Sequence, residues 1–440
     1  MRVSVFLACL LTLAITGAAF AQQASTAQPI TLAQAIARAR ANEPAFAAAA
    51  ANKQVTALDR SIARAALLPD ATYHNQVLYT QPNGARNGGG PIGSQAAPRF
   101  IANNAVREYA SQGIITENLG VARVTAASRA AAADAVAAAE LEIARRGLVS
   151  AVTTLFYQEL AGEHKVDVAR RADNEAASFT QLTQQRESAR EAAHADVVKA
   201  QLQQQQRDRD LADAQLQAEK ARLDLGVLLF PDPRNPYTLA PGAVVPLPAR
   251  AEVDEAAMRL SPELKQAISA LRVSSLDVTA ARAAYLPDIG LNFTYGIDAS
   301  QFAVNGSDGV KNLGYSAAAT IDIPVWDWLS TQHRVRQSEI LRDVARTTLS
   351  ATQRRLVADL DETYSEASTA RDQLQSLDQS VDTATQSLRL TRLRYTAGEA
   401  TVLEVVDAES SLITAENARE DGMTRYQLAL SNLQLLTGAL

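Results

Sequence analysis

Two carboxylates near the C-terminal end of the sequence are spaced so that they can act together. Glu404 and Asp407 are three residues apart, so on a helix they share one face. Carboxylates gathered around an opening attract cations and make the opening cation-selective. Thr401 offers Glu404 a different role, because residues 401–404 (Thr-Val-Leu-Glu) have the spacing of a capping box, in which the carboxylate binds the start of the helix. Both roles remain open at this point.

No motif of an enzyme accompanies these carboxylates. The sequence contains neither a His-Glu-x-x-His zinc motif nor a Gly-x-Ser-x-Gly nucleophile motif, and residues 87–90 (Asn-Gly-Gly-Gly) lack the lysine of a phosphate-binding loop. The formal net charge is −6, and no basic face stands out. We therefore predict no enzyme activity, no catalytic residues, no metal site, no cofactor and no nucleic-acid partner.

The first 21 residues have the features of a secretory signal peptide. Arg2 precedes an apolar run over residues 3–17, which is short for a membrane anchor, and Ala19 and Ala21 form a cleavage site. The single cysteine, Cys9, lies inside this segment. The mature chain would then contain no disulfide and no lipidated N-terminal cysteine. We predict an exported protein.

The elements that position the two carboxylates belong to a repeat. Pro44 and Pro262 lie in similar surroundings 218 residues apart, and so do Pro69 and Pro287, each of which follows a leucine. Repetition at this distance indicates a duplicated structural unit. The predicted parts of the chain are a signal peptide, a first repeat, an inter-repeat linker and a second repeat, at residues 1–21, 22–230, 231–250 and 251–440.

Each repeat is predicted to contain a helix, two strands, a long helix and a return helix. The six predicted helices cover residues 31–67, 123–187, 195–229, 253–285, 328–394 and 401–436. The longer ones would extend about 95 Å at the rise of an α-helix. Apolar residues at alternating three- and four-residue spacing over residues 374–395 and 405–436 predict a coiled-coil hairpin.

Between each Leu-Pro pair and the next long helix, the apolar period changes to two. The alternation is clear in residues 288–297 and 312–323 and weaker in 71–80 and 106–119. Such strands can cross a membrane with the apolar face toward lipid, although a soluble sheet with one wet face shows the same pattern. Four strands cannot close a barrel, so the membrane interpretation requires a dimer or a trimer.

Several fragments resemble the TolC-like outer-membrane efflux proteins. Residues 394–399 (Arg-Tyr-Thr-Ala-Gly-Glu) and 403–408 (Leu-Glu-Val-Val-Asp-Ala) are similar to the second helical tip of that family. Residues 323–327 (Ile-Pro-Val-Trp-Asp) are similar to its strand-to-helix junction, and the pairs ending in Pro69 and Pro287 match its helix-to-strand junctions. The fragments occur in the family's order over nearly the whole mature chain.

The resemblance implies a mainly α fold with a transmembrane β part. Long coiled-coil hairpins would form an α-barrel, and four strands per chain would contribute to a trimeric 12-stranded β-barrel in the outer membrane of a Gram-negative-type bacterium. The implied function is a passive exit duct in a tripartite efflux or type I secretion system. Its partners would be outer-membrane lipid, a periplasmic adaptor and an inner-membrane pump of the RND or ABC type. The alternative is a soluble periplasmic coiled-coil tether without a pore.

The resemblance also assigns roles to residues of the tips. Glu404 and Asp407 match the acidic ring at the periplasmic entrance. Tyr395 and Asp196 match a lock in which the aspartate bonds a tyrosine of the neighbouring helix pair. The family's basic residue in this lock is replaced by Ala400, so we expect a weaker lock.

The remaining expected sites lie at turns and junctions. Gly398 is expected to end a helix in the left-handed conformation, and Arg190 stands at the equivalent place in the first repeat, where the family usually has glycine. Pro324 joins Pro69 and Pro287 as a strand–helix junction residue. Trp326 and Trp328, the only tryptophans, are expected either in an aromatic belt at the membrane surface or in a packed junction.

Overall fold

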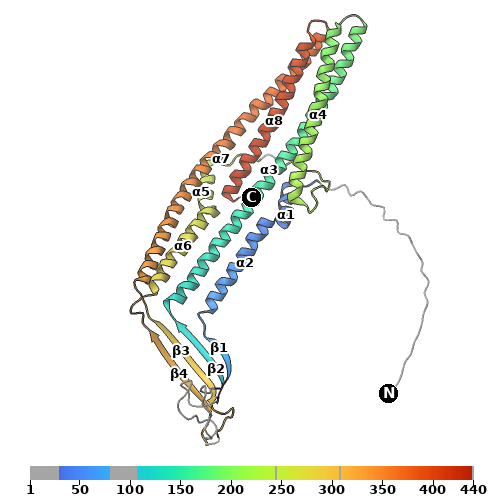
Figure 1. The fold of residues 1–440 in the computed structure, drawn as a ribbon. Coiled ribbons are helices and arrows are strands. Elements are labelled where there is room, and N and C mark those ends of the chain that lie inside the picture. The colour runs from blue at the N-terminus through green and yellow to red at the C-terminus, as the bar shows by residue number, and fades with distance from the viewer. Residues whose placement is uncertain (1–28, 80–106, 243–244, 307–308, 439–440) are drawn as a thin grey trace, which may run out of the picture.

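The computed structural model of the chain is a long, slightly bent molecule with a small sheet at one end and two helical hairpin tips at the other (Figure 1). It describes residues 29–79, 107–242, 245–306 and 309–438. The predicted signal peptide and the glycine-rich stretch at residues 87–90 lie outside the described residues.

The helices and strands of the described residues come in the same order twice. The first half contains α1 (Leu32–Asn42), α2 (Pro44–Ala65), β1 (Asp70–Tyr79), β2 (Arg107–Leu119), α3 (Val121–Ser188) and α4 (His194–Leu229). The second half contains α5 (Arg250–Leu260), α6 (Pro262–Ala283), β3 (Asp288–Ala299), β4 (Leu313–Asp322), α7 (Ser330–Thr396) and α8 (Val402–Thr437). The predicted class, mainly α with a small β part, is confirmed.

The helix before each pair of strands is broken, and our prediction of one continuous helix there is wrong. The breaks fall at Glu43 and Ser261, whose backbones are not helical (φ −80°, ψ 114° and φ −56°, ψ 120°). Each residue precedes a proline, and the proline ring disfavours the helical conformation in the residue before it. Pro44 and Pro262 then begin α2 and α6, where a missing N–H costs nothing.

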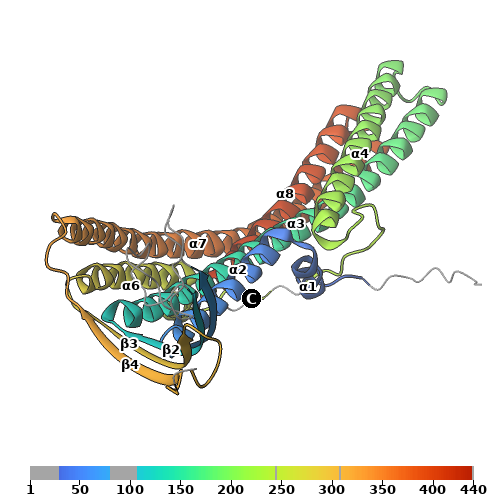
Figure 2. The same ribbon diagram turned by 60° about the horizontal axis from the view of Figure 1, so that its bottom comes forward.

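Two long helices organise the rest of the molecule. α3 contains 68 residues and α7 contains 67, so each is about 100 Å long. α2 and α4 lie along α3, and α6 and α8 lie along α7, in each case one shorter helix after the other (Figure 1). α3 also packs against α6 and α8 and so joins the two halves. Near the sheet the helices form one curved layer in the order α2, α3, α6, α7 (Figure 2).

The sheet is antiparallel in the order β1-β2-β3-β4. Tyr73 pairs with Gly113, Gly113 with Tyr295, and Tyr295 with Tyr315. Residues directly opposite each other lie on the same face of a sheet, so this register gathers the predicted apolar positions of all four strands on one face. Asn292 and Thr294 belong to the opposite, mostly polar face.

The apolar face is uncovered in the single chain. Tyr73 is 72% exposed and Tyr315 is 77% exposed. Further large apolar side chains on this face with more than a third of their surface exposed are Val77, Tyr79, Ile115, Leu119, Ile289, Leu291, Phe293, Tyr295, Leu313 and Ile321. A contiguous apolar surface of this kind is typical of a face that contacts lipid or another protein.

In the part of the chain that the structure describes, no helix is both long enough and apolar enough to cross a membrane.

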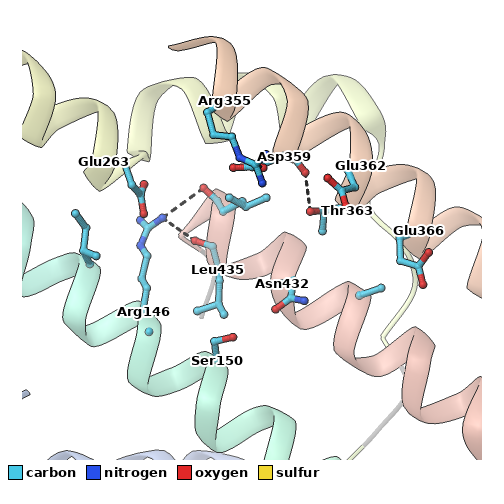
Figure 3. Close-up of a pocket in the computed structure, with 14 residues that line it drawn as sticks. Arg146, Ser150, Glu263, Arg355, Asp359, Glu362, Thr363, Glu366, Asn432 and Leu435 are labelled. Atoms are coloured by element: carbon cyan, nitrogen blue, oxygen red, sulfur yellow. Dashed lines mark hydrogen bonds and ion pairs between the residues drawn. The ribbon is translucent and has the colours of Figure 1, made fainter. Parts of the chain in front are cut away.

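Arg146 ties two helix ends to the middle of α3. One guanidinium nitrogen donates to the carbonyl of Leu435 at 2.6 Å, and the other terminal nitrogen donates to the carbonyl of Leu260 at 3.0 Å. Nε donates to Glu142 at 2.9 Å. The cation thus satisfies carbonyls at the C-terminal ends of α5 and α8, where the helix dipoles favour positive charge. Figure 3 shows this side chain beside a cavity of about 620 Å³.

Arg146→Ala is expected to destabilise the protein. The substitution removes charge-assisted bonds to two helix ends, each worth about 1.5–3 kcal/mol, so the free energy of unfolding should fall by about 3–6 kcal/mol. Urea unfolding of the detergent-solubilised protein, followed by circular dichroism, measures the change.

Arg170→Ala is the matched control. Arg170 is another arginine of α3, its side chain is 57% exposed, and it pairs with Asp167 within the same helix. This control should change the free energy of unfolding by less than about 0.5 kcal/mol. Equal effects of the two substitutions would contradict the proposed role of Arg146.

Candidate functional site at the helical tips

The two hairpin tips share one turn geometry. Arg190 has φ 64° and Gly398 has φ 81°, so both adopt the left-handed conformation. In the first tip the amide of Glu191 donates to the carbonyl of Arg186 at 2.8 Å, and in the second the amide of Glu399 donates to the carbonyl of Arg394 at 2.8 Å. With the second bond from Arg190 or Gly398, each turn is a complete Schellman motif.

The residue types at the two turns differ in cost. Glycine adopts positive φ freely, whereas an L-residue with a Cβ atom loses about 1–2 kcal/mol there. Arg190 is therefore a strained residue at an exposed apex, and Gly398 is not. Arg190 and Gly398 thus occupy equivalent positions in the two turns, as the sequence predicts. Arg190 is strained because this position favours glycine.

Tyr395 is buried between the two hairpins, with 5% of its surface exposed. Its ring packs against Phe179 at 5.1 Å between centroids, and the Arg186 guanidinium lies 4.9 Å from its centroid. Its hydroxyl donates to the Thr183 hydroxyl at 3.3 Å. Within the chain the structure does not bring Tyr395 to Asp196, which is half-buried in the first turn of α4. A lock with Asp196 of a neighbouring chain stays a prediction.

Arg186 is a tip residue that sequence reasoning missed. Besides lying over the Tyr395 ring, its guanidinium donates to the carbonyl of Tyr395. It thereby joins the end of α3 to the end of α7. The repeat could have drawn attention to Arg186, because Arg186 and Arg394 are equivalent arginines of the two tips. They are 208 residues apart, the same distance as Arg190 and Gly398.

Glu404 forms the capping box. One of its carboxylate oxygens accepts from the Thr401 amide at 3.1 Å, and the Thr401 hydroxyl accepts from the Glu404 amide at 3.3 Å. Arg394 adds an ion pair at 3.4 Å. The bond from the Thr401 backbone, with help from the Thr401 side chain and Arg394, lowers the pKa of Glu404. The carboxylate is therefore ionised but engaged at the start of α8.

Asp407 has a different environment one turn later. It is exposed on α8, and no hydrogen bond or ion pair to its carboxylate occurs in the described part of the chain. Its charge is available to solutes, whereas that of Glu404 is partly used by the helix start and Arg394. Of the two carboxylates that the sequence singled out, Asp407 is the better placed to face an opening.

A charge cluster around the buried Glu409 joins the hairpins behind the tip. Arg392 of α7 donates to Glu409 of α8 at 2.7 Å and to Glu175 of α3 at 3.0 Å. Glu409 is only 4% exposed, and burial raises its pKa while Arg392 lowers it. Sequence spacing gave no sign of this cluster, because its members come from three helices.

The junction residues lie at the other end of the helices. Pro69 and Pro287 immediately precede β1 and β3, and Pro324 follows β4 by two residues. Trp326 and Trp328 stack edge-on at 5.8 Å and are 68% and 83% exposed. They contact each other and are not packed into the protein, so the single chain does not bury them at a junction.

Comparisons with known proteins agree with this architecture. Residues 255–439 match the family model "Outer membrane efflux protein". The chain aligns over 92% of its length with the open-state MtrE outer membrane channel of Neisseria gonorrhoeae, covering 88% of that chain with a TM-score of 0.77 and 20% identity. The second half of the chain is thus similar to outer membrane efflux proteins, and the whole chain shares the fold of outer membrane channels.

Two curated proteins that the chain resembles come from Pseudomonas aeruginosa. Outer membrane protein OprJ is 26% identical over 172 residues, which is 39% of this chain and 36% of the relative. Alkaline protease secretion protein AprF is 25% identical over 187 residues, which is 42% of this chain and 38% of the relative. The chain thus spans little more than a third of the length of the curated relatives it matches.

Substitution of the two turn residues should shift the stability of the two tips in opposite directions. Arg190→Gly relieves the left-handed strain and should stabilise the first turn by about 0.5–1 kcal/mol, and Gly398→Ala should destabilise the second by a similar amount. Hydrogen exchange of the Glu191 and Glu399 amides, which close the two turns, measures both effects. Faster exchange of the Glu191 amide in Arg190→Gly would show that side-chain contacts of Arg190 outweigh its backbone strain.

Proposed function

We propose that this protein is the exit duct of a tripartite efflux or type I secretion system, working as a passive trimeric channel. Substrates would pass from a periplasmic adaptor and an inner-membrane RND or ABC pump to the exterior. The observation that carries the proposal is the four-stranded sheet, which has one apolar and one polar face and an open edge at each side. Relatives named for outer-membrane and secretion functions support the same assignment.

The open edges of the sheet favour assembly of several copies. β1 and β4 each pair on one side only in the described sheet. Within lipid every backbone polar group needs a partner, so the edges must be closed by other strands. Joining β4 of one chain to β1 of the next satisfies them, and three chains supply the twelve strands expected from the resemblance.

The helical layer has matching open edges. Val55, Leu58 and Ile62 of α2 form an exposed apolar stripe, each more than half exposed. Ile340, Leu341 and Val344 form another on α7, at the opposite side of the layer (Figure 2). Burial of apolar surface is favourable by about 25 cal/mol per Å². We therefore expect α7 of one chain to pack on α2 of the next. The same rotation that closes the sheet closes the helices.

The repeats and tips have roles in this proposal. Residues 22–230 and 251–440 act as two equivalent units joined by residues 231–250. In a trimer Asp407, with Glu404, would surround the narrow end, and Asp196 would reach Tyr395 of a neighbouring chain. The exposed tryptophans would lie at the membrane surface on the periplasmic side. A soluble tether would leave the apolar face of the sheet in water.

The purified protein is expected to form trimers in mild detergent and to conduct ions across planar bilayers. Light scattering gives the mass, and single-channel recording gives the conductance. A folded monomer without conductance would overturn the proposal.

A matched pair of sheet variants controls for nonspecific leakage. Tyr295→Arg places a charge on the apolar face and should cost about 2–4 kcal/mol near the bilayer midplane, which lowers the amount of assembled channel. Asn292→Arg, on the polar face, should assemble normally and change the single-channel conductance.

Removal of the tip carboxylates should strongly weaken block by cations. Asp407→Asn with Glu404→Gln is expected to weaken block by trivalent hexammine cobalt, added from the tip side, by about tenfold or more, because the attraction grows with every charge in the ring. Asp407→Asn alone should have the larger single effect, since Glu404 is engaged in the helix cap. Titration of single-channel current measures the block.

Asp407→Glu keeps the charge and is expected to keep the block. Trimer stability should be unchanged in all these variants, because both residues are exposed. If the double variant is blocked as strongly as the wild type, the acidic ring lies elsewhere.

A further inference from the structure

A buried carboxyl group lies at mid-length in α3, far from the tips. Glu159 is 1% exposed, and its Oε1 atom has no hydrogen-bond partner in the described part of the chain. Its Oε2 atom lies 2.6 Å from the hydroxyl of Tyr237. Tyr237 belongs to residues 231–242, the described beginning of the inter-repeat linker, here called the inter-repeat segment.

The hydrogen bonds around Tyr237 require one more proton than the tyrosine carries. Its hydroxyl oxygen is 2.6 Å from Glu159 and 2.7 Å from the carbonyl oxygen of Arg222 in α4. A carbonyl and a carboxylate are both acceptors only, and the hydroxyl has a single hydrogen. Both contacts are hydrogen bonds if Glu159 is protonated, because the carboxyl then donates to Tyr237 and Tyr237 donates to Arg222.

The charged and titratable neighbours of Glu159 would not neutralise a negative charge on it. These neighbours are Glu163 on α3, Arg222 and Glu219 on α4, and Tyr237 in the inter-repeat segment. The Arg222 guanidinium is bound to both oxygens of Glu219, at 2.7 and 2.8 Å, and does not pair with Glu159. The pKa of Glu159 is raised to about 7, chiefly by burial; Glu163 and Glu219 also raise it, and Tyr237 and Arg222 oppose the increase.

Tyr237 holds the inter-repeat segment in place. Tyr237 and Leu239 belong to the core cluster around Phe156 of α3 and Leu225 of α4. The segment in turn binds the residue that leads into α1: the Ile30 amide donates to the Thr238 carbonyl at 2.8 Å, and the Ala240 amide donates to the Ile30 carbonyl at 3.0 Å. Release of Tyr237 would therefore weaken the two backbone hydrogen bonds that join Ile30 to the inter-repeat segment.

We propose that a proton on Glu159 fastens the inter-repeat segment, and with it the residues before α1, to α3 and α4, and that loss of this proton loosens them. The ligand of this site is the proton itself. This inference does not rest on the proposed channel function, since it uses only contacts within one chain.

The direction of the pH effect follows from the change in pKa. Local opening exposes Glu159 to water and returns its pKa to the ordinary value near 4.5, below the value of about 7 in the closed state. The closed state then binds more protons between these values. Its extra stability is complete below pH 4.5, is lost as pH rises through 7, and does not change above that.

Hydrogen exchange of the intact, detergent-solubilised protein tests the proposal. After correction for the intrinsic pH dependence of exchange, the opening constant for the Ile30 and Ala240 amides should rise by about tenfold between pH 6 and pH 8. Glu159→Gln is neutral and nearly the same shape, so its opening constant should be equal at the two pH values. Tyr237→Phe keeps the ring but loses the hydroxyl, and should open faster at both.

Glu163→Gln is the matched control, because it removes a nearby carboxylate that does not bond Tyr237. It should retain most of the tenfold change. A wild-type protein whose opening constant is equal at pH 6 and pH 8 would overturn the proposal without any variant. Loss of the pH dependence in Glu163→Gln, or its persistence in Glu159→Gln, would overturn it equally.

Discussion

A helix of about 100 Å has no core of its own, and the fold depends on how α3 and α7 are covered along their whole length. In proteins, most of the stability of a helix comes from tertiary packing, so these two are stabilised by the shorter helices packed beside them. Small residues make the approach close. A Cβ atom on Gly162 would lie 3.3 Å from the Cα atom of Ala218, and one on Gly422 would lie 2.3 Å from a methyl carbon of Leu377. The breaks at Glu43 and Ser261 set where the covering helices α2 and α6 begin.

The two ends of this framework present different surfaces. At the sheet, the strands place large apolar side chains on one face and leave them exposed; at the tips, exposed charged residues such as Arg190 and Asp407 lie among exposed leucines such as Leu393 and Leu403. Three carboxylates within six residues near the tip have different environments: Glu404 binds a helix start, Asp407 is open to solvent, and Glu409 is buried and pairs with Arg392. In this short stretch of α8 a carboxylate therefore caps a helix at one position, is exposed at a second and joins helices at a third.

Much of the fold was predictable because it rests on local patterns. Period-two alternation placed β3 and β4, and even the weak alternation of β2 was enough to locate it, because a strand needs only its neighbours in sequence to define its faces. The breaks at Glu43 and Ser261 were missed, although the prolines had been used to find the repeat. The hydroxyl of Tyr395 binds Thr183, which is 212 residues away, and Glu159 meets Tyr237 across 78 residues. Contacts of this kind depend on how helices are placed in space, which spacing along the sequence does not encode.

The starts of the two return helices differ in one detail. α8 begins with the reciprocal cap of Thr401 and Glu404, whereas the N-cap residue of α4 is Ala193, which has no side-chain cap bond. An N-terminal cap is worth about 1 kcal/mol. The return helix of the α3–α4 hairpin therefore starts without a stabilising interaction that the return helix of the α7–α8 hairpin has.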